Sequence, residues 1–322
     1  MKKIRLTMLS LCCVLIMAGN AFAADTFLKI GTGPIGGYWF TIGSIWSTLI
    51  TDQVANVKAS PTPGGAISNI QNIAKKSMHY GFVKGYNAPE AIAGTGPFEK
   101  HKYPGLRAVC SLYPEPMQIL FPKEKGYKTV EDLRGKHMSP GKMGFGGAIL
   151  FGWILEANNM TYDDVKVSYL SFSDSALALK DKNMDFVAIT ISAPSATYLD
   201  VDVQSPLDAL ELDDKTVDYI TKKYPVNTWV MKKGTYAGMD RDIRCLSSPA
   251  FIVTGDWMSE EVVYESTKLF WENVEKFHSI APDIKRELSL KTALEGINIP
   301  LHKGAYKYYV EKGLTIPDAI KP

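Results

Sequence analysis

Three glycine-rich turns are the segments of this sequence whose residue types could do chemistry. They are Gly31-Thr-Gly33-Pro-Ile-Gly36, Thr62-Pro-Gly64-Gly65-Ala66 and the stretch 141–147, and each follows a predicted strand and precedes a predicted helix. Glycine lets the main chain approach a ligand closely, and the free N–H groups at the start of a helix attract an anion. Such turns gather at the carboxyl ends of strands in an open sheet, so they predict a shared crevice that captures an anionic group.

The first turn also fits the Gly-x-Gly-x-x-Gly pattern of dinucleotide-binding proteins, but its surroundings argue against a nucleotide. Those proteins place an acidic residue near the end of the second strand to bind the ribose. This chain has Ser60-Pro61-Thr62 at that place. Main-chain capture of a smaller anion is the interpretation that survives.

Two lysines could supply a positive charge to the crevice. Lys84 ends the third predicted strand, and Lys142 lies within the third glycine turn. The alternative for both is a side chain that extends into solvent, which is common for lysine at a strand end. Among the aromatic residues, Tyr38-Trp39-Phe40 is the best candidate to line a ligand site, and packing in the core of a helix is its alternative.

The sequence contains none of the common patterns of catalytic or metal-binding residues. It has no His-Glu-x-x-His, Gly-x-Ser-x-Gly, Cys-x-x-Cys or Walker motif, and its 5 histidines are widely scattered. We therefore predict a binding protein rather than an enzyme, with no cofactor and no metal site.

The amino terminus has the features of a cleaved secretory signal. Lys2, Lys3 and Arg5 precede an apolar run over residues 6–18, and Ala21-Phe22-Ala23 follows, which predicts cleavage near Ala23 and a periplasmic location. The apolar run has about 13 residues against the ~20 that span a bilayer, so a membrane anchor is the weaker interpretation. Without residues 1–23, the 36 basic side chains fall to 33 against 34 acidic ones. This near-neutral balance excludes a basic surface for nucleic acid.

Export would place Cys110 and Cys245 in an oxidising compartment, where a disulfide can form. Both residues lie in apolar, strand-like segments, and two buried free thiols are the equal alternative. The choice depends on whether their Cα atoms come within bridging distance.

The elements that must position the glycine turns alternate between strands and helices, which predicts an α/β fold with mixed sheets flanked by helices. In the first part of the chain we expect strands at 27–30, 57–60, 80–84 and 107–112, with helices at 38–51, 66–75 and 87–93. Tyr113-Pro-Glu-Pro116 interrupts this pattern because proline lacks a ladder donor, and it predicts a segment that crosses to a second domain. A long apolar strand at 243–254 predicts the return.

This organisation predicts three parts of the chain. They are a signal peptide over residues 1–23, a first domain formed by 24–115 plus 248–322, and a second domain formed by 116–247. Two crossing strands suit a hinge about which two domains close on each other.

The ordered series of short motifs resembles one known family, the TAXI-class solute-binding proteins of tripartite ATP-independent periplasmic (TRAP) transporters. The resemblance runs from about Phe27 to Gly313, and it rests on order and spacing because each motif alone is common. The motifs are Gly31-Thr-Gly33 with Gly36-Gly37-Tyr38, Thr62-Pro-Gly-Gly65 with Asn69, Leu106-Arg107, Ser111 to Pro116, Asp132 to Lys136, Ala188 to Pro194, Gly234-Thr-Tyr236, and Pro300 to Gly313.

The resemblance implies a two-domain, periplasmic-binding-protein-like fold of type II with its ligand cleft between the domains. It implies a monomeric receptor that closes over a small anionic solute, such as a carboxylate, an oxo-acid or an acidic amino acid, and delivers it to TRAP membrane permease subunits. A solute-binding protein of an ABC importer, or a periplasmic sensing partner, is the alternative. Carried over by position, the ligand contacts would be Thr32, Gly33, Gly36, Gly37, Tyr38, Gly64, Gly65, Ala66, Lys84, Tyr113, Phe145, Gly146, Gly147 and Thr190.

The sequence departs from the family pattern within these same turns. The family carries hydroxyl, amide and carboxylate side chains where this chain has Gly65-Ala66-Ile67, Lys84-Gly85-Tyr86 and Gly144-Phe145-Gly146-Gly147. The gain of a lysine and a phenyl ring predicts a ligand that is more anionic and more apolar than glutamate.

Overall fold

The computed structural model describes residues 26–279, 284–285 and 287–322. The predicted signal peptide, residues 1–23, lies outside these ranges. Within them, no helix has the length and apolarity needed to cross a membrane.

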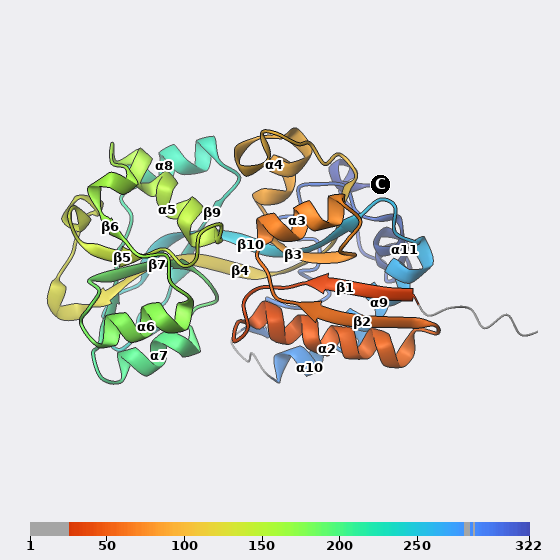
Figure 1. Ribbon diagram of the computed structural model, residues 1–322, viewed down its shortest axis with the longest axis horizontal. Coiled ribbons are helices and arrows are strands. Elements are labelled where there is room, and N and C mark those ends of the chain that lie inside the picture. Colours follow the sequence, from red (N-terminus) through yellow and green to blue (C-terminus); the bar gives the residue numbers. More distant parts are fainter. Residues whose placement is uncertain (1–25, 280–283, 286) are drawn as a thin grey trace, which may run out of the picture.

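In the part of the chain that the structure describes, ten strands form two mixed sheets that share β4, with helices packed on their faces (Figure 1). The strands are β1 Thr26–Gly31, β2 Val57–Thr62, β3 Tyr80–Lys84, β4 Leu106–Pro122, β5 His137–Ser139, β6 Lys166–Val167, β7 Phe186–Thr190, β8 Leu207–Ala209, β9 Asn227–Met231 and β10 Ile243–Gly255. The α-helices are α2 Tyr38–Gln53, α3 Ala66–Ala74, α4 Asn87–Ala93, α5 Gly146–Ala157, α6 Phe172–Lys180, α7 Ala196–Asp202, α8 Asp214–Lys223, α9 Glu260–Glu272, α10 Val274–His278 and α11 Lys303–Glu311.

The first sheet is built on the parallel strands β1, β2 and β3. Strand β10 pairs antiparallel with β3, and β4 pairs antiparallel with β10. Figure 1 shows α3 and α4 on one side of these strands and α2 on the other. Helix α2 buries Trp39, Ile42, Trp46 and Leu49 against the sheet, because side chains three and four positions apart share one face of a helix.

The second sheet has the order β4-β7-β5-β6, and β4 is antiparallel to β7 whereas β5 is parallel to both β6 and β7. In Figure 1, α5 and α8 lie on one side of it and α6 and α7 on the other. Helix α5 is apolar around most of its surface, and it buries Leu150, Phe151 and Ile154. The two sheets thus form separate lobes of one molecule.

Two long strands, β4 and β10, join the lobes and form the hinge region. At the crossing point Pro116 pairs with Ser247 and Pro114 with Pro249. Strand β7 pairs with β4 only from Met117 onward, and β3 pairs with β10 only from Ala250 onward. Across Pro114–Pro116 the described strands pair β4 with β10 alone, whereas β10 also pairs with β9 as far as Ser247 and accepts a hydrogen bond from the Gly85 N–H at Pro249.

The prediction that the prolines interrupt the strand is wrong, because β4 runs unbroken from Leu106 to Pro122. A strand with a neighbour on one side can hold proline, since the missing N–H is not needed on its open side. The prediction that this segment crosses between the two halves is confirmed by the pairing of Met117 with Thr190 in the second sheet.

The buried apolar residues divide in the same way as the sheets. One cluster draws on residues 28–113 and 250–320, and two further clusters draw on residues 117–246 together with Tyr86. The domain boundaries at residues 115, 116, 247 and 248 stay a prediction, which this distribution of buried residues supports.

The structure decides between the alternatives for the cysteines. Cys110 pairs in register with Ile252 on β10, whereas Cys245 lies near the other end of that strand. At about 3.3 Å per residue, the seven positions between Cys245 and Ile252 span roughly 23 Å, far beyond the ~7 Å limit for a disulfide. Both cysteines are buried free thiols.

Candidate ligand-binding cleft

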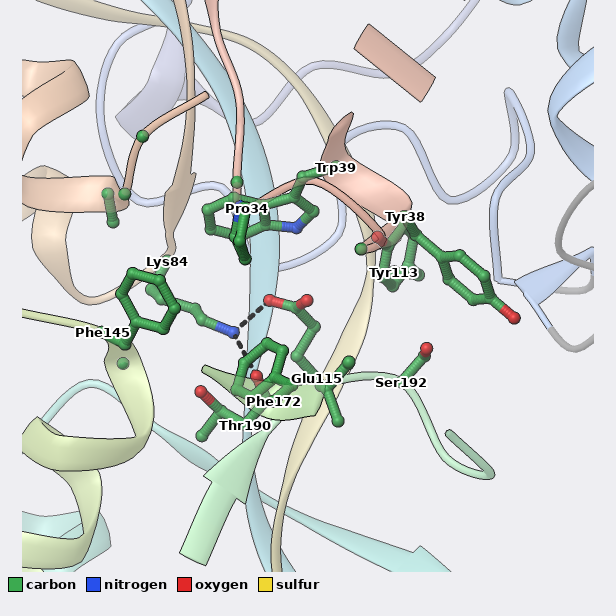
Figure 2. Close-up of a pocket in the computed structure, with 17 residues that line it drawn as sticks. Pro34, Tyr38, Trp39, Lys84, Tyr113, Glu115, Phe145, Phe172, Thr190 and Ser192 are labelled. Carbon is green, nitrogen blue, oxygen red and sulfur yellow. Dashed lines mark hydrogen bonds and ion pairs between the residues drawn. The ribbon is translucent and has the colours of Figure 1, made fainter. Parts of the chain in front are cut away.

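A cavity of about 50 Å³, which we call the inner cavity, lies between the two lobes beside the hinge (Figure 2). Its wall consists of Gly33, Pro34, Gly37, Tyr38, Trp39, Gly64, Gly65, Ala66, Lys84, Tyr113, Glu115, Phe145, Gly146, Phe172, Thr190, Ile191 and Ser192. A wider cavity of about 670 Å³, the outer cavity, adjoins it and shares seven of these wall residues. All three predicted glycine turns contribute to this cleft, as the sequence predicts.

Most of the residues predicted to contact a ligand lie on the wall of the inner cavity. They are Gly33, Gly37, Tyr38, Gly64, Gly65, Ala66, Lys84, Tyr113, Phe145, Gly146 and Thr190, and Gly36 lies on the wall of the outer cavity. Thr32 and Gly147 line neither. The Thr32 hydroxyl is buried and donates to the carbonyls of Gly33 and Thr62, each at 3.1 Å.

Gly147 has a packing role instead of a place on the cavity wall. A Cβ atom there would stand 2.6 Å from the carbonyl oxygen of Pro140 and 2.8 Å from that of Ala188. Only glycine lets α5 approach the sheet this closely. Its neighbour Gly146 does face the cleft, because a Cβ there would stand 2.8 Å from Lys84 Cε.

Three helices begin at the wall of the inner cavity. Their N-cap residues are Gly37 for α2, Gly65 for α3 and Phe145 for α5, and none of them provides a capping side chain. None of these helices has an acidic residue in its first turn. Each N-terminus carries a partial positive charge of about +0.5, so the wall has a positive potential that owes nothing to a charged side chain.

Lys84 and Glu115 form a buried ion pair on the same wall. Lys84 ends β3 and is 4% exposed, and Glu115 lies in the hinge part of β4 and is 5% exposed. The Lys84 ammonium donates to the Glu115 carboxylate, and to the carbonyl oxygen of Thr190 in the other lobe at 3.2 Å (Figure 2).

The prediction that Lys84 faces the crevice is correct, but its charge is not free to meet an anion. Burial lowers the pKa of Lys84 and raises the pKa of Glu115, and the attraction between the two groups opposes both shifts. The pair has a net charge of zero whichever of the two groups holds the shared proton. Lys142, the other candidate, is exposed and lies on the wall of the outer cavity.

Two buried donors beside this ion pair have no hydrogen-bond partner among the described residues. They are the indole Nε1 of Trp39 and the hydroxyl of Tyr113, in side chains that are 8% and 2% exposed. The Trp39 N–H is directed at the Glu115 carboxylate and lowers the pKa of that carboxyl by hydrogen bonding, although no close hydrogen bond joins the two groups. Since an unpaired buried donor costs about 1–3 kcal/mol, the Tyr113 hydroxyl on this cavity wall indicates a site for a ligand acceptor, and the Trp39 N–H beside it is a second donor.

Aromatic rings cover much of the remaining wall. Tyr38 and Tyr113 meet edge to face with their centroids 6.4 Å apart, and Phe145 and Phe172 lie 5.8 Å apart in the second lobe. These rings suit an apolar portion of a ligand. Within the described residues no group of three His, Cys, Asp or Glu side chains could hold a metal ion.

Contacts across the cleft hold the two lobes together. The Tyr86 hydroxyl, from the first lobe, donates to the carbonyl oxygen of Gly146 at 3.2 Å, and its ring packs edge-on against Trp153 with 5.1 Å between centroids. With the hydrogen bond from Lys84 to Thr190, these contacts make the present arrangement a closed one.

Six wall residues were not among the predicted contacts: Pro34, Trp39, Glu115, Phe172, Ile191 and Ser192. Trp39 belongs to the aromatic triplet that the sequence favours as a possible ligand contact. Glu115 could have been found, because a carboxylate inside an apolar crossing strand needs a buried partner, and Lys84 ends another apolar strand of the same sheet. Phe172 has no local signal beyond its aromatic ring.

A comparison with protein families decides the relationship of the chain. The model of the NMT1-like family matches residues 30–313. The chain belongs to the NMT1-like family. The TAXI class suggested by the motifs is a narrower assignment than this family match shows.

Solved structures with similar folds are distant in sequence from this NMT1-like protein. PhnD1 from Prochlorococcus marinus (MIT 9301), in complex with methylphosphonate, is 10% identical, with a TM-score of 0.52 over 81% of this chain and 90% of that one. A putative L-cystine ABC transporter from Listeria monocytogenes is 11% identical, with a TM-score of 0.50 over 82% and 98% of the two chains. The alkanesulfonate-binding protein SsuA from Xanthomonas axonopodis pv. citri, bound to MOPS, is 14% identical, with a TM-score of 0.49 over 82% and 83%.

The first two likenesses confirm the predicted α/β, periplasmic-binding-protein-like fold with mixed sheets flanked by helices.

Proposed function

We propose that this NMT1-like protein is an exported receptor that captures a small organic anion between its lobes and delivers it to a membrane importer. The observation that carries the proposal is the wall of the inner cavity, where three helix N-termini without N-cap side chains meet the unpaired Tyr113 hydroxyl and the Trp39 N–H. A carboxylate, sulfonate or phosphonate group offers only acceptors, so it would satisfy these donors and lie in the field of the helix ends.

Capture by hinge closure follows from the way both lobes build the cleft. Tyr38 and Lys84 belong to the first lobe, and Phe145 and Thr190 belong to the second. An open form would separate these residues, so a ligand touches all of them only when the lobes are closed. Binding shifts the population toward the closed form by the ligand's difference in affinity for the two states. The two-stranded crossing is the part of the chain about which such a movement can occur.

An ABC importer is our leading candidate for the partner, since one neighbour in fold is named as an ABC transporter component. A TRAP permease is the second candidate, because the ordered motifs from Gly31 to Gly313 resemble TAXI-class receptors. Vesicles that contain the candidate permease and the loaded receptor would separate the two. Uptake that requires ATP inside the vesicle supports the ABC importer, whereas uptake driven by an ion gradient without ATP supports the TRAP permease.

Export and a monomeric state are part of the same proposal. The basic and apolar leader over residues 1–23 supports export. Light scattering on the purified mature protein would give the mass of one chain, and cell fractionation would find it outside the cytoplasm.

A ligand panel tests the receptor function directly. Carboxylates, oxo-acids, sulfonates, phosphonates and amino acids would be screened by thermal shift, and hits would be titrated by calorimetry. A true ligand at a hundredfold excess over its Kd stabilises the protein by about 2.7 kcal/mol. Replacing Trp39 by Phe should weaken every hit, and the retained ligand should be recovered chemically unchanged. A panel in which no anion stabilises the protein would contradict the proposal.

A further inference from the structure

We infer that the ligand carries one negative charge on an apolar body, and that Glu115 is the residue that limits the charge to one. This inference rests on the proposed receptor function and specifies the class of its ligand. It differs from the prediction made from the sequence, in which Lys84 makes the ligand more anionic than glutamate.

The first step is the charge of the inner cavity. Lys84 and Glu115 are the only acidic or basic side chains among the described residues of its wall, and they neutralise each other through a direct hydrogen bond. The wall therefore has no formal charge to spare. What remains for an anion is the partial charge of the three helix N-termini and two neutral donors, which suits one anionic group.

The second step is the position of Glu115. Its carboxylate lies beside Trp39 and Lys84 (Figure 2), in the part of the wall where a ligand anion would meet the Trp39 donor. One ligand charge can be accommodated there by the helix ends. A second one would face a buried carboxylate whose only counter-ion on the wall is already used, and like charges placed together in a dry cleft weaken binding strongly.

The third step is the size and lining of the cleft. A water needs about 10–15 Å³ of such space, so the inner cavity of about 50 Å³ holds roughly three to five water-sized groups. That is the size of one acid group and the carbon that bears it. The rest of the ligand must extend into the outer cavity of about 670 Å³ past Phe145 and Phe172, which line both cavities.

Lys142 does not change this balance. It lies on the wall of the outer cavity only, and its side chain is exposed. Water and salt screen such a charge within about 10 Å at ordinary ionic strength. A second acid group on the same carbon as the first would therefore be held beside Glu115, out of reach of effective help from Lys142.

Matched ligand pairs test the inference. Phenylacetate and phenylmalonate share a phenyl ring, and isovalerate and isopropylmalonate share a branched alkyl chain. In each pair the second compound carries an additional carboxylate on the carbon that bears the first one. Each would be titrated by calorimetry against the mature protein at pH 7.5, where the malonates are dianions. We expect the monoanions to bind at least tenfold more tightly. Equal or tighter binding of the malonates would overturn the inference.

Glu115→Gln removes the carboxylate and leaves Lys84 as the one titratable side chain of the wall, which a bound dianion holds in its protonated form, so this variant should bind phenylmalonate at least tenfold more tightly than the wild type does. The double variant Lys84→Met/Glu115→Gln should not show this increase in affinity for phenylmalonate, because it also removes the Lys84 ammonium that the dianion would meet. Glu131→Gln, which alters a surface carboxylate paired with Arg134, should leave the preference for monoanions unchanged.

The outcomes separate this inference from the proposed function. If neither phenylmalonate nor any other dianion gains affinity in Glu115→Gln, and circular dichroism shows the variant folded, Glu115 does not set the charge limit. If the variant is unfolded without ligand, phenylmalonate should restore its folded circular dichroism spectrum at a lower concentration than phenylacetate does, and the reverse order would overturn the inference. If the malonates bind the wild type well, the receptor function stands and the charge limit fails. If no acid of either charge binds, the receptor function itself fails.

Discussion

The substitution Tyr113→Phe should make the free protein more stable and the receptor weaker. The Tyr113 hydroxyl is buried and has no hydrogen-bond partner among the described residues. Burial, the nearby Glu115 charge and Tyr38 raise the pKa of this hydroxyl well above its usual range. The hydroxyl therefore stays protonated and can donate a hydrogen bond to a ligand. Removing it relieves part of a desolvation penalty of about 1–3 kcal/mol.

We therefore expect the free energy of unfolding to rise by about 1 kcal/mol in the absence of ligand. For domains of this size that corresponds to an increase in Tm of about 2–4 °C. A hydrogen bond to a charged group contributes about 1.5–3 kcal/mol, so the Kd for an anionic ligand should rise by roughly ten- to a hundredfold. Urea unfolding of the free protein and calorimetric titration of the best ligand measure the two effects separately.

Tyr236→Phe is the matched control, because the Tyr236 hydroxyl is buried with both of its roles satisfied. It donates to Gln118 Oε1 at 2.6 Å and accepts from the Ser195 N–H at 3.0 Å. Its loss should lower the free energy of unfolding by about 1–3 kcal/mol and leave the affinity nearly unchanged. A Tyr113→Phe protein that loses stability as Tyr236→Phe does, or that binds the ligand as well as wild type, would refute the view that Tyr113 is kept unpaired for a ligand.

Three further predictions concern the fold, the pH response and the thiols. Gly147→Ala should lower the free energy of unfolding by about 1–3 kcal/mol, since its Cβ meets main-chain oxygens at 2.6 and 2.8 Å. Gly65→Ala, whose Cβ would meet only Phe145 at 3.6 Å, should cost less than Gly147→Ala because it loses only an N-cap preference, and equal losses in urea unfolding would contradict this. Hydrogen bonds from Lys223, Tyr219 and Tyr224 lower the pKa of Glu156 from 4.5 to about 2. A carboxylate whose pKa is lower in the folded protein than in the unfolded chain stabilises the fold at pH values above its unfolded pKa. This stabilisation is lost as the pH falls toward the pKa of the folded protein. Glu156→Gln should therefore cost about 1 kcal/mol or less at pH 7, and the difference from wild type should vanish between pH 4.5 and 2; a difference that persists at pH 2 would count against it. Burial raises the pKa of Cys245 to about 12 and that of Cys110 further, so neither thiol should react with a thiol reagent until the protein is unfolded, and an intact mass that shows a disulfide would contradict the free thiols.

The architecture could be predicted because it depends on local patterns. Short apolar strands alternate with amphipathic helices, and the apolar return strand at 243–254 matches β10 at Ile243–Gly255. The glycine turns could also be placed at one cleft, since parallel strands bring their carboxyl ends to the same edge of a sheet. The continuity of β4 through Pro114 and Pro116 could not be predicted, because it depends on which side of the strand has a neighbour.

The chemistry of the site was harder to predict, because it depends on pairs of residues remote in sequence. Lys84 could be placed at the crevice from its position at a strand end, but its partner Glu115 lies 31 positions further along the chain. Pairing of the two changes the expected ligand from a strongly anionic one to a monoanion. Thr32 and Gly147 show the opposite error, since a position inside a motif does not reveal whether a residue faces a cavity or supports the packing behind it.

A crystal structure of the mature protein grown with its tightest monoanionic ligand tests the central claim most directly. The account predicts that the acid group lies in the inner cavity, within hydrogen-bond distance of Trp39 Nε1 and the Tyr113 hydroxyl, with the apolar body extending between Phe145 and Phe172. It also predicts that Lys84 and Glu115 stay paired. A ligand bound elsewhere, or one whose acid group displaces Glu115 from Lys84, would contradict it.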